Sequence, residues 1–507
     1  MELPAGWAWA PLRDICIPVK KVGSEGFGKD RFQYIDIGSV NGPDRQITAA
    51  SWIESSDAPG RARQIVKEGD TLYSTVRPYL RKIARVPGTL DGHIASTGFA
   101  VIRPHREINS RYIFHAVQDK LFEEQLFPKQ RGVSYPAVRD ADVFETAIPI
   151  PPMREQQRIV EALEGHLSRI DAASRSLSHA QALIPLQRRA LYTAAAEGRI
   201  ANGNGDVADF FASRLESWRI THGEKKYREP VAADPDYLPV TPQGWKIFSL
   251  EALTDPVRII RYGILMPKVK SGGTVPYVEV KDLKGCSLHE KKLHLTSAEL
   301  DAKFAGARIQ SGDVLLAVRG SYDRSAVVSR DLSGANVSRD VARIAPLPGI
   351  VPEYLHIYLQ SGFSQRYLKA HARGVAVKGV NIASIRALPV AVPSVTTQMK
   401  IVEACQQQLS AIDAAEKATA LSSSRCMVLR KALLTRAFSG ELVHQDLTEE
   451  PAFVILDRIR AESEAQGGKP RRAARRLPKT IAADTPPPPP ASSTPSPTAA
   501  VQQELPL

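Results

Sequence analysis

The sequence predicts a protein of mixed α/β (α+β) class, with two globular domains joined by long helices within an internal two-fold pseudo-repeat. Three observations predict this fold. One helical segment occurs twice, as QQRIVEALEGHLSRIDAA at 156–173 and as QMKIVEACQQQLSAIDAA at 398–415. Each copy follows roughly 150 residues of short apolar segments separated by Gly, Pro and Asn turns, which is typical of strands. In the first copy, apolar residues recur at every seventh position, as in a helix that packs on another helix.

The repeat extends well beyond this helical segment. Ile170 corresponds to Ile412, and this offset (412 − 170 = 242) is nearly kept along the chain. LPAGW at 3–7 matches TPQGW at 241–245, and AIPIPP at 147–152 matches ALPVAVP at 387–393. Because the matching segments also keep their order, the sequence predicts duplication of a unit of about 240 residues, far longer than a solenoid repeat.

The globular part of each unit is expected to contain half-buried strands and short helices. The predicted strands are YIDIGSV, DTLYSTV and GFAVIRP in the first copy and YVEV, DVLLAVR and VARIAP in the second. Helices are expected at Tyr112–Leu126 and Tyr354–Ala370. Outside the shared strands the two copies diverge, as expected of two domains that recognise different targets.

The last part of each unit is predicted to be helical. Pro185 is expected to kink or break the first long helix, so that a second short helix runs from Arg188–Arg189 to a C-capping Gly198, and Gly440 ends the second copy. The second copy has a weaker apolar face, with Cys405 in place of Leu163. The residues expected to pack between the helices, rather than to bind a ligand, are Ile159, Leu163, Leu167, Ile170, Leu177, Ile184, Ile401, Leu409 and Ile412.

Composition favours polyanionic partners and a cytoplasmic protein, although on charge alone a merely soluble basic protein fits equally well. The net charge is +13 and the pI about 9.5, which favours polyanionic partners. Four scattered cysteines without a CxxC pair fit a reducing compartment and argue against a cysteine zinc site. No apolar stretch reaches 18 residues, and the N-terminus lacks the pattern of a signal peptide, so no membrane association is expected.

The segments that resemble catalytic motifs lack residues or spacings that the chemistry requires. GSEGFGKD at 23–30 resembles a phosphate-binding loop, but Asp30 replaces the Ser/Thr that binds magnesium and a strand follows. His289 and His294 are five residues apart, not the four that would place them on one helical face for zinc. The Gly-rich loop and Asn/Asp-Pro-Pro-aromatic pair of an adenine methyltransferase are not found. We therefore expect no catalytic residue, no metal site and no cofactor in this chain.

The combined pattern resembles the specificity subunit of type I restriction–modification systems. The resemblance rests on LPAGW and TPQGW at the start of each half and on IPIPPMREQQRIVEAL at 148–163. The turns Gly69–Asp70 and Gly312–Asp313 and the closing RRAL…G and RKAL…G segments agree. It covers about residues 1–445, and the second junction, VPSVTTQMKIVEA, lacks the usual Glu before Gln.

The resemblance implies two target-recognition domains separated by antiparallel spacer helices, each domain recognising one half of a split, asymmetric double-stranded DNA site. Two methyltransferase subunits and two ATP-driven restriction subunits would bind this chain, and S-adenosylmethionine, ATP and Mg²⁺ would be used by those partners. The predicted regions are target-recognition domain 1 at 1–152, central spacer helices at 153–205, a linker with a short helix at 206–240, target-recognition domain 2 at 241–393, distal spacer helices at 394–445, a C-terminal helix and basic segment at 446–480, and a disordered Pro-rich tail at 481–507.

The loops after the paired strands carry candidate DNA-binding side chains. Base edges are recognised by Arg, Lys, Asn, Gln, Ser or Thr, while other basic residues contact phosphates. For any single residue an ordinary solvated side chain is the competing interpretation, but the group as a whole favours DNA contact. The candidates are Arg77, Tyr79, Arg81, Lys82, Arg131, Ser134 and Tyr135 in the first domain, and Arg319, Ser321, Tyr322, Arg324, Arg373, Lys378 and Asn381 in the second.

Three other functions fit parts of the sequence. A stand-alone DNA-binding regulator would bind tightly without partners and leave no methylation. A helical scaffold would not use the basic charge. An enzyme with an unrecognised site would methylate or cut DNA unaided.

A spacer helix from about Glu155 to Ile184 would be roughly 45 Å long, enough to separate two DNA-binding domains by about one turn of DNA. Insertion of one helical turn near Ala172 is therefore expected to change the gap between the two half-sites. Mapping N6-methyladenine in genomic DNA measures this gap, and an unaltered gap would refute the spacer role.

Overall fold

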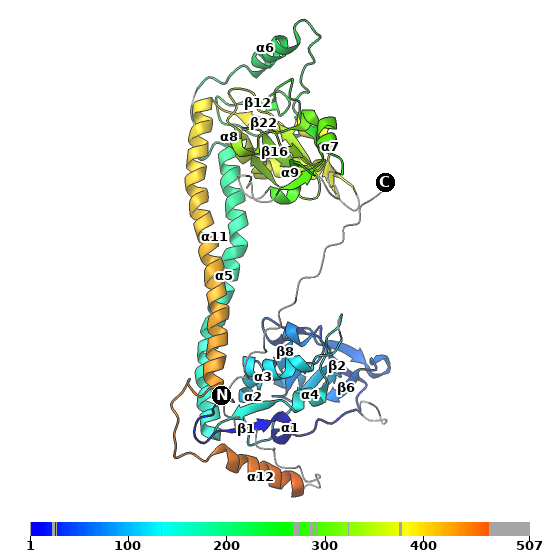
Figure 1. Ribbon diagram of the computed structural model, residues 1–507, viewed down its shortest axis with the longest axis vertical. Helices are drawn as coiled ribbons and strands as arrows, with labels where there is room; N and C mark the ends of the chain where they lie inside the picture. Colours follow the sequence, from blue (N-terminus) through cyan, green and yellow to red (C-terminus); the bar gives the residue numbers. More distant parts are fainter. Residues whose placement is uncertain are drawn as a thin grey trace, which may run out of the picture. The chain divides into compact units, whose positions relative to one another are not determined.

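The structure is a computed structural model. It describes residues 2–22, 26, 28–132, 134–201, 203, 205–266, 273–283, 288, 293–322, 324–374 and 378–465. The basic segment, the Pro-rich tail and most of the HEKKLH motif lie outside these residues, as do Gly23, Ser24, Glu25 and Phe27. The chain is of mixed helix and strand class and forms two compact units (Figure 1). Unit 1 contains the described residues of 1–163 and 433–507, and unit 2 contains those of 164–432.

Unit 1 contains short sheets and small helices. Its sheets have the strand orders β5-β2-β9-β6, β10-β7-β8, β1-β11 and β3-β4. The strands are β1 (Ala8–Pro11), β2 (Arg31–Ile35), β3 (Val40–Asn41), β4 (Gln46–Ile47), β5 (Ser51–Glu54), β6 (Ala62–Ile65), β7 (Thr71–Ser74), β8 (Ile83–Arg85), β9 (Ile94–Ser96), β10 (Phe99–Ile102) and β11 (Ala147–Ile150). The helices lying wholly in this unit are α1 (Leu12–Ile15), α2 (Ser110–Ala116), α3 (Lys120–Leu126), α4 (Asp140–Phe144) and α12 (Ala452–Ala465).

Unit 2 repeats much of this topology. Its sheets have the strand orders β13-β19-β16-β17, β15-β14-β18, β12-β22 and β20-β21. The strands are β12 (Lys246–Ser249), β13 (Arg261–Tyr262), β14 (Val275–Val278), β15 (His294–Thr296), β16 (Val314–Ala317), β17 (Ser325–Val327), β18 (Asn336–Val337), β19 (Val341–Ile344), β20 (Ala372–Arg373), β21 (Gly379–Val380) and β22 (Pro389–Val392). The helices lying wholly in this unit are α6 (Phe210–His222), α7 (Ala298–Lys303), α8 (Pro352–Gln360), α9 (Gly362–His371) and α10 (Ile382–Ala387).

The duplication seen in the sequence is also present in strand pairing. In both units an N-terminal strand pairs antiparallel with the strand that precedes a long helix, as β1 with β11 and as β12 with β22. In both units a strand lies between one antiparallel and one parallel neighbour, as β2 and β14 do. The two copies therefore share a scaffold, and their differences lie in the segments that connect it.

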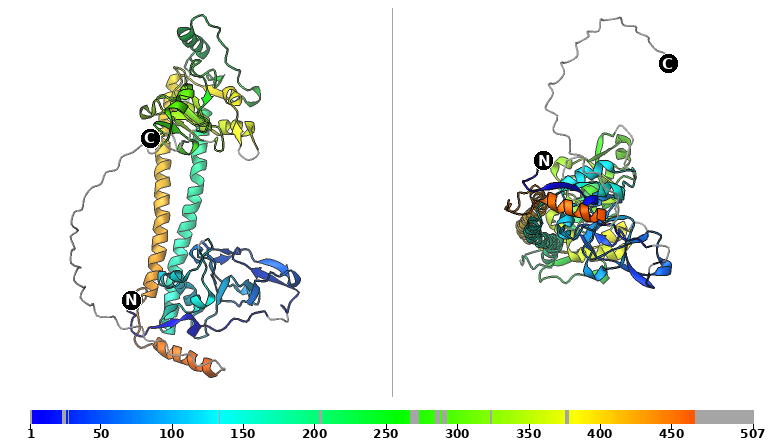
Figure 2. Two further views of the ribbon diagram at one scale, coloured as in Figure 1. Left: turned by 45° about the vertical axis from the view of Figure 1, so that its right-hand side comes forward. Right: turned by 90° about the horizontal axis from the view of Figure 1, so that it is seen from below.

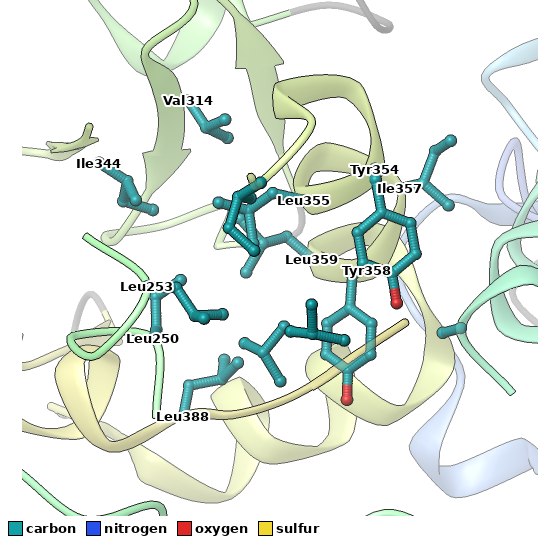
Figure 3. Packing of buried hydrophobic residues seen from close by; sticks show 14 of the residues in the cluster. Leu250, Leu253, Val314, Ile344, Tyr354, Leu355, Ile357, Tyr358, Leu359 and Leu388 are labelled. Atoms are coloured by element: carbon teal, nitrogen blue, oxygen red, sulfur yellow. The ribbon is translucent and has the colours of Figure 1, made fainter. Parts of the chain in front are cut away.

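The central strands are more deeply buried than the sequence predicts. We expected half-buried strands, but every residue of β7, β10, β16 and β19 is buried. The expectation was wrong because in unit 2 one face of β16 packs against α8, while the other face packs against strands β14 and β18 of the neighbouring sheet. In unit 2, Val314 of β16 and Ile344 of β19 pack with Leu355 and Leu359 of α8 (Figure 3).

Each helical segment predicted in the domains is in fact two helices. The segment at 112–126 is divided between α2 and α3, because the Asp119 side chain accepts a hydrogen bond from Leu121 N and starts a new helix. The segment at 354–370 is divided between α8 and α9, where the Ser361 side chain accepts from Ser364 N. Such side-chain caps favour a new helix start over continuation of the old one.

The two long helices are α5 (Met153–Ala196) and α11 (Val395–Phe438), each of 44 residues. The separate helix expected after Pro185 does not form, because α5 continues through this proline to Ala196. Gly198 and Gly440 have positive φ, and the amides that follow them, at Arg199 and Glu441, donate to carbonyl groups of the last helical turn. Both glycines therefore occupy the left-handed position that ends a helix.

Most of the residues expected to pack along the long helices are buried. The burial of α5 follows a heptad pattern, with spacings of three and four residues. Ile159, Leu163, Leu167, Ile184, Ile401 and Leu409 are buried, and Ile170, Leu177 and Ile412 are partly buried.

In unit 2, α5 and α11 lie side by side and run antiparallel (Figure 1, Figure 2). Arg188 of α5 contacts Asp413 of α11 at 2.9 Å, and Arg430 of α11 contacts Asp171 of α5. These residues are repeat partners, because the offset of 242 relates Arg188 to Arg430 and Asp171 to Asp413. The same ion pair thus occurs twice in opposite directions, which fixes the register of the helix pair.

A buried glutamine in the first turn of each long helix binds that helix to its domain. Gln156 accepts from Asn109 N at 2.9 Å and donates to Pro151 O at 3.0 Å. Gln398 accepts from Val351 N at 2.9 Å and donates to Pro393 O at 3.1 Å. The two sets of partners also differ by 242 residues.

The residue before each glutamine makes the two junctions unequal. Glu155 is buried and accepts a hydrogen bond from the Trp7 indole at 3.0 Å. Thr397 occupies the corresponding position in the second copy, and there the buried Trp245 indole has no hydrogen-bond partner among the described residues. Burial raises the pKa of Glu155, while Trp7 and Arg158 act in the opposite direction.

Replacing Glu155 tests this junction. Glu155→Ala leaves the Trp7 indole buried without an acceptor and is expected to lower the free energy of unfolding by roughly 1–3 kcal/mol. Glu155→Gln keeps an acceptor and is expected to cost much less. Urea unfolding followed by tryptophan fluorescence measures both, and equal losses for the two variants would contradict the role of the hydrogen bond.

Candidate nucleic-acid interface

The two groups of candidate residues in the first domain lie on neighbouring loops. The chain between β7 and β8 places Arg77 and Arg81 in the left-handed region, each with φ of 49°. Arg77 N donates to Pro136 O at 2.7 Å, and Val76 forms a β-bridge with Ala137. The loop at 131–137 is thereby bound to the loop at 75–82, although the two are far apart in the sequence.

The exposed part of this surface is aromatic and basic. Tyr79 is 50% exposed and Tyr135 is 68% exposed. The Arg77 guanidinium lies over the Tyr135 ring, 4.4 Å from its centroid. Arg131 and Ser134 are exposed beside it. Exposed rings with adjacent guanidinium groups suit contacts with bases and phosphates.

Two of the candidates already have partners within the domain. Arg81 forms an ion pair with Glu123 at 2.5 Å, and Lys82 Nζ donates to Ile37 O at 2.8 Å. Both side chains therefore hold the loop in place. Their contact with DNA stays a prediction, and it would use the N–H groups that these bonds leave free.

The second domain brings its two candidate groups together in the same way. Arg319 forms a β-bridge with Gly379, and Gly320 N donates to Lys378 O at 3.0 Å. Arg319, Arg373 and Lys378 are exposed. In both domains, then, the loop after the central strand is paired with a loop that lies after the short helices.

The remaining candidates of this domain are less accessible for contact with DNA. Ser321 and Tyr322 are partly buried, and Arg324 Nη1 donates weakly to Val280 O at 3.4 Å. The Asn381 side chain accepts from Ser384 N and caps α10. Of the amide group of Asn381, the nitrogen is the part left to donate to a ligand.

A basic cleft of about 900 Å³ adjoins this surface in unit 2. Three of the candidates, Arg319, Arg373 and Asn381, lie in its wall. The sequence did not single out four further basic residues in the wall, which are Arg261, Lys303, Arg339 and Arg386. Among the described residues a single acidic side chain, Asp340, lines the cleft. A concave surface in which positive charges predominate concentrates the electrostatic field and attracts anions.

A buried arginine lies behind the wall of this cleft. Arg343 of β19 is 1% exposed, and its guanidinium donates to the carbonyl oxygens of Arg258, Ile259 and Gly306 at 3.0–3.1 Å. Burial lowers the pKa of Arg343 to about 10, and the neighbouring Arg258 guanidinium acts in the same direction. The side chain remains charged at neutral pH.

Two other features are absent from the part of the chain that the structure describes. No group of three or more His, Cys, Asp or Glu side chains there is arranged to hold a metal ion. Nor does any described helix combine the length and apolar character needed to cross a membrane.

Arg319→Ala is expected to weaken DNA binding about tenfold and to relax recognition of one half-site only, as for loss of one direct contact to a base. Arg330→Ala is a matched control, because Arg330 is an exposed arginine of the same domain outside the cleft. Methylation mapping and affinity measurements compare the two. Equal effects of both substitutions would mean that only net charge matters.

Comparison with known proteins gives consistent matches. The family model of the type I restriction modification DNA specificity domain matches residues 5–177. The type I restriction enzyme EcoBI specificity subunit of Escherichia coli is 27% identical over 372 residues, which are 71% of this chain and 73% of that protein. The EcoKI specificity subunit of Escherichia coli strain K12 is 23% identical over 383 residues, 73% of this chain and 75% of that protein.

Solved structures agree with these matches. The HsdS subunit from Thermoanaerobacter tengcongensis is 25% identical, with a TM-score of 0.51 over 87% of this chain and 98% of that chain. A chain from a structure on complex assembly and conformational transition of the type I R-M system is 26% identical. Its TM-score is 0.67, over 87% of this chain and 100% of that chain. In sequence and in fold, this chain is similar to the specificity subunits of type I restriction–modification systems.

Proposed function

We propose that this chain recognises a bipartite, asymmetric site in double-stranded DNA, with each globular domain recognising one half-site. In this way it directs adenine N6 methylation and ATP-dependent restriction to that site. The partner subunits carry out both reactions, and the chain itself supplies recognition.

The observation that carries this proposal is the repeated meeting of two basic loops. Arg77 and Arg131 lie on adjacent loops in the first domain, and Arg319 and Arg373 lie on the corresponding loops in the second. The scaffolds that carry the loops are alike, whereas the loop sequences differ. A shared scaffold with different exposed side chains is what two domains need to recognise two different short sequences.

The helix pair supports the second part of the proposal, namely a fixed gap between the half-sites. Its two ion pairs, Arg188 with Asp413 and Arg430 with Asp171, hold one register of α5 against α11. A helix pair held in one register keeps a constant distance between its two ends. We infer that the number of residues in these helices sets the gap in the DNA site.

The repeat also supports binding of partners in pairs. A chain with two quasi-equivalent halves offers two similar surfaces, so two copies of one protein can bind without dimerisation of the chain itself. We propose two methyltransferase subunits and two restriction subunits as these partners, in the cytoplasm where the DNA lies. An adenine must leave the duplex to be methylated, which fits a separate enzyme positioned beside a bound site.

Exchange of one domain tests the proposal. Replacing residues 1–150 with the corresponding domain of a relative, in a strain that carries the methyltransferase subunits, is expected to change one half of the methylated motif and leave the other intact. Replacing residues 241–391 is the matched exchange and is expected to change the other half.

Genome-wide mapping of N6-methyladenine measures both exchanges. If the methylated motif stays the same after both exchanges, these domains do not recognise the DNA sequence and the proposal is refuted. Tight sequence-specific binding with no methylation in the host would instead identify a stand-alone DNA-binding regulator.

A further inference from the structure

Arg343 is a buried cation that lacks a carboxylate partner. Within the described residues it forms no ion pair, and its three hydrogen bonds all go to backbone carbonyl oxygens. The nearby carboxylate, Asp313, already binds the Arg258 guanidinium at 2.5 and 2.8 Å. The carbonyl oxygens stabilise this buried charge without neutralising it, and the Nε of Arg343 has no hydrogen-bond partner among the described residues.

The three carbonyl groups belong to the two segments that form one wall of the basic cleft. Arg258 and Ile259 precede Arg261, while Gly306 follows Lys303. Ile259, Arg261 and Lys303 line the cleft. One guanidinium therefore holds together the segment that carries Arg261 and the segment that carries Lys303.

Gly306 lies between the two arginines. Its carbonyl oxygen accepts from Arg343 at 3.0 Å, and the guanidinium of Arg261 occupies the space where a side chain at this position would lie. A β-carbon at 306 would overlap Arg261 Nη1. Glycine at this position thus allows the Arg261 guanidinium to lie directly against the backbone.

Arg261 and Arg343 are also direct neighbours across the antiparallel pair of β13 and β19. Directly opposed residues of such a pair lie on one face, and like charges there repel each other. A bound anion on this face offsets that repulsion. The other cations of the cleft, Arg319, Arg339 and Arg373, add to the attraction for an anion.

The first domain lacks this arrangement. The offset of 242 places Val101 at the position of Arg343, and both pair with a leucine of the adjacent strand, Leu72 and Leu315 respectively. The buried cation is therefore a feature that distinguishes the second copy from the first, which points to a task specific to the second domain.

We propose that Arg343 is a positioning residue that presets Arg261 in the cleft of the second domain, and that this cleft binds a phosphate group of the DNA backbone beside the second half-site. The inference rests on the proposed function and adds to it a phosphate contact that carries no sequence information. Arginine forks suit phosphate oxygens because two parallel N–H groups can donate to them at once.

The test uses the full chain assembled with its methyltransferase subunits and a duplex that contains the methylated motif of the host genome. Affinity is measured over a range of salt concentrations for Arg261→Ala, Arg343→Met and the double variant. Loss of one phosphate contact makes the slope of log affinity against log salt less negative by about 0.9. Each single variant is expected to show this change with an affinity loss of about three- to tenfold, and the double variant to show no further change. The methylated motif is expected to stay the same, since phosphate contacts do not specify bases.

A second variant covers the case in which Arg343→Met fails to fold. Gly306→Ala keeps the buried cation but displaces the Arg261 guanidinium, which is the end of a flexible side chain. Gly306 does not have a positive φ, so the backbone accepts alanine. Gly306→Ala is expected to reproduce the slope change of Arg261→Ala.

Leu355→Ala is the control for a purely structural effect, because Leu355 is buried in the same unit and does not line the cleft. It is expected to lower the melting temperature and leave the salt slope as in the wild type. The inference is overturned if Arg343→Met behaves like Leu355→Ala, or if Arg261→Ala and Gly306→Ala both keep the wild-type slope. The wild-type complex is measured first. If it does not bind a bipartite site, the proposed function itself is overturned, whatever the variants show.

Discussion

The rest of the molecule depends on a single buried amide at the start of each long helix. Gln156 and Gln398 each connect three pieces of backbone, namely the helix itself, the proline-containing strand end before it and the residue that precedes the small helices of the domain. The amide can make these bonds because it both donates and accepts. An aliphatic residue of equal size would leave an amide and a carbonyl group unpaired in the interior, which is costly. Each domain is in this way held to its helix by a polar bond network rather than by apolar packing alone.

The two copies differ in one hydrogen bond at the start of the long helix, which the first copy forms and the second does not. Trp7 donates to Glu155, whereas Trp245 is buried with its indole N–H unpaired among the described residues. The backbone around both junctions is otherwise alike. The two copies thus share this geometry, but only the first has an acceptor for its indole N–H, so the first junction is the better satisfied of the two. The same comparison applies to β10 and β19, where Val101 of the first copy corresponds to the buried Arg343 of the second.

Much of the scaffold could be predicted from the sequence, because periodicity and repetition are local signals. The heptad spacing of Leu163, Ile170 and Leu177 predicts a helix directly, and Gly198 marks its end. The prediction of a helix break at Pro185 was wrong. Helix propensity is a weak signal that tertiary packing overrides, and α5 has buried residues on both sides of the proline, at Ile184 and Leu191.

The site depends on contacts that no local signal reports. The bridge between Val76 and Ala137, which brings Arg77 beside Tyr135, joins residues without a shared motif. Pairing of Arg81 with Glu123 likewise depends on the tertiary fold. Arg261 lies on a strand of two residues, too short to give a periodic pattern. The sequence identifies the basic residues of the loops. It does not show which of them are exposed and which form bonds within the domain.

The contact among Arg261, Gly306 and Arg343 has a consequence for sequence evolution. A side chain at 306 excludes Arg261 from its place, and loss of Arg343 leaves the Gly306 carbonyl without its donor. We therefore expect these three positions to co-vary among homologues. Arg339 and Arg373 lie in the same cleft without sharing this glycine, so each is free to drift independently.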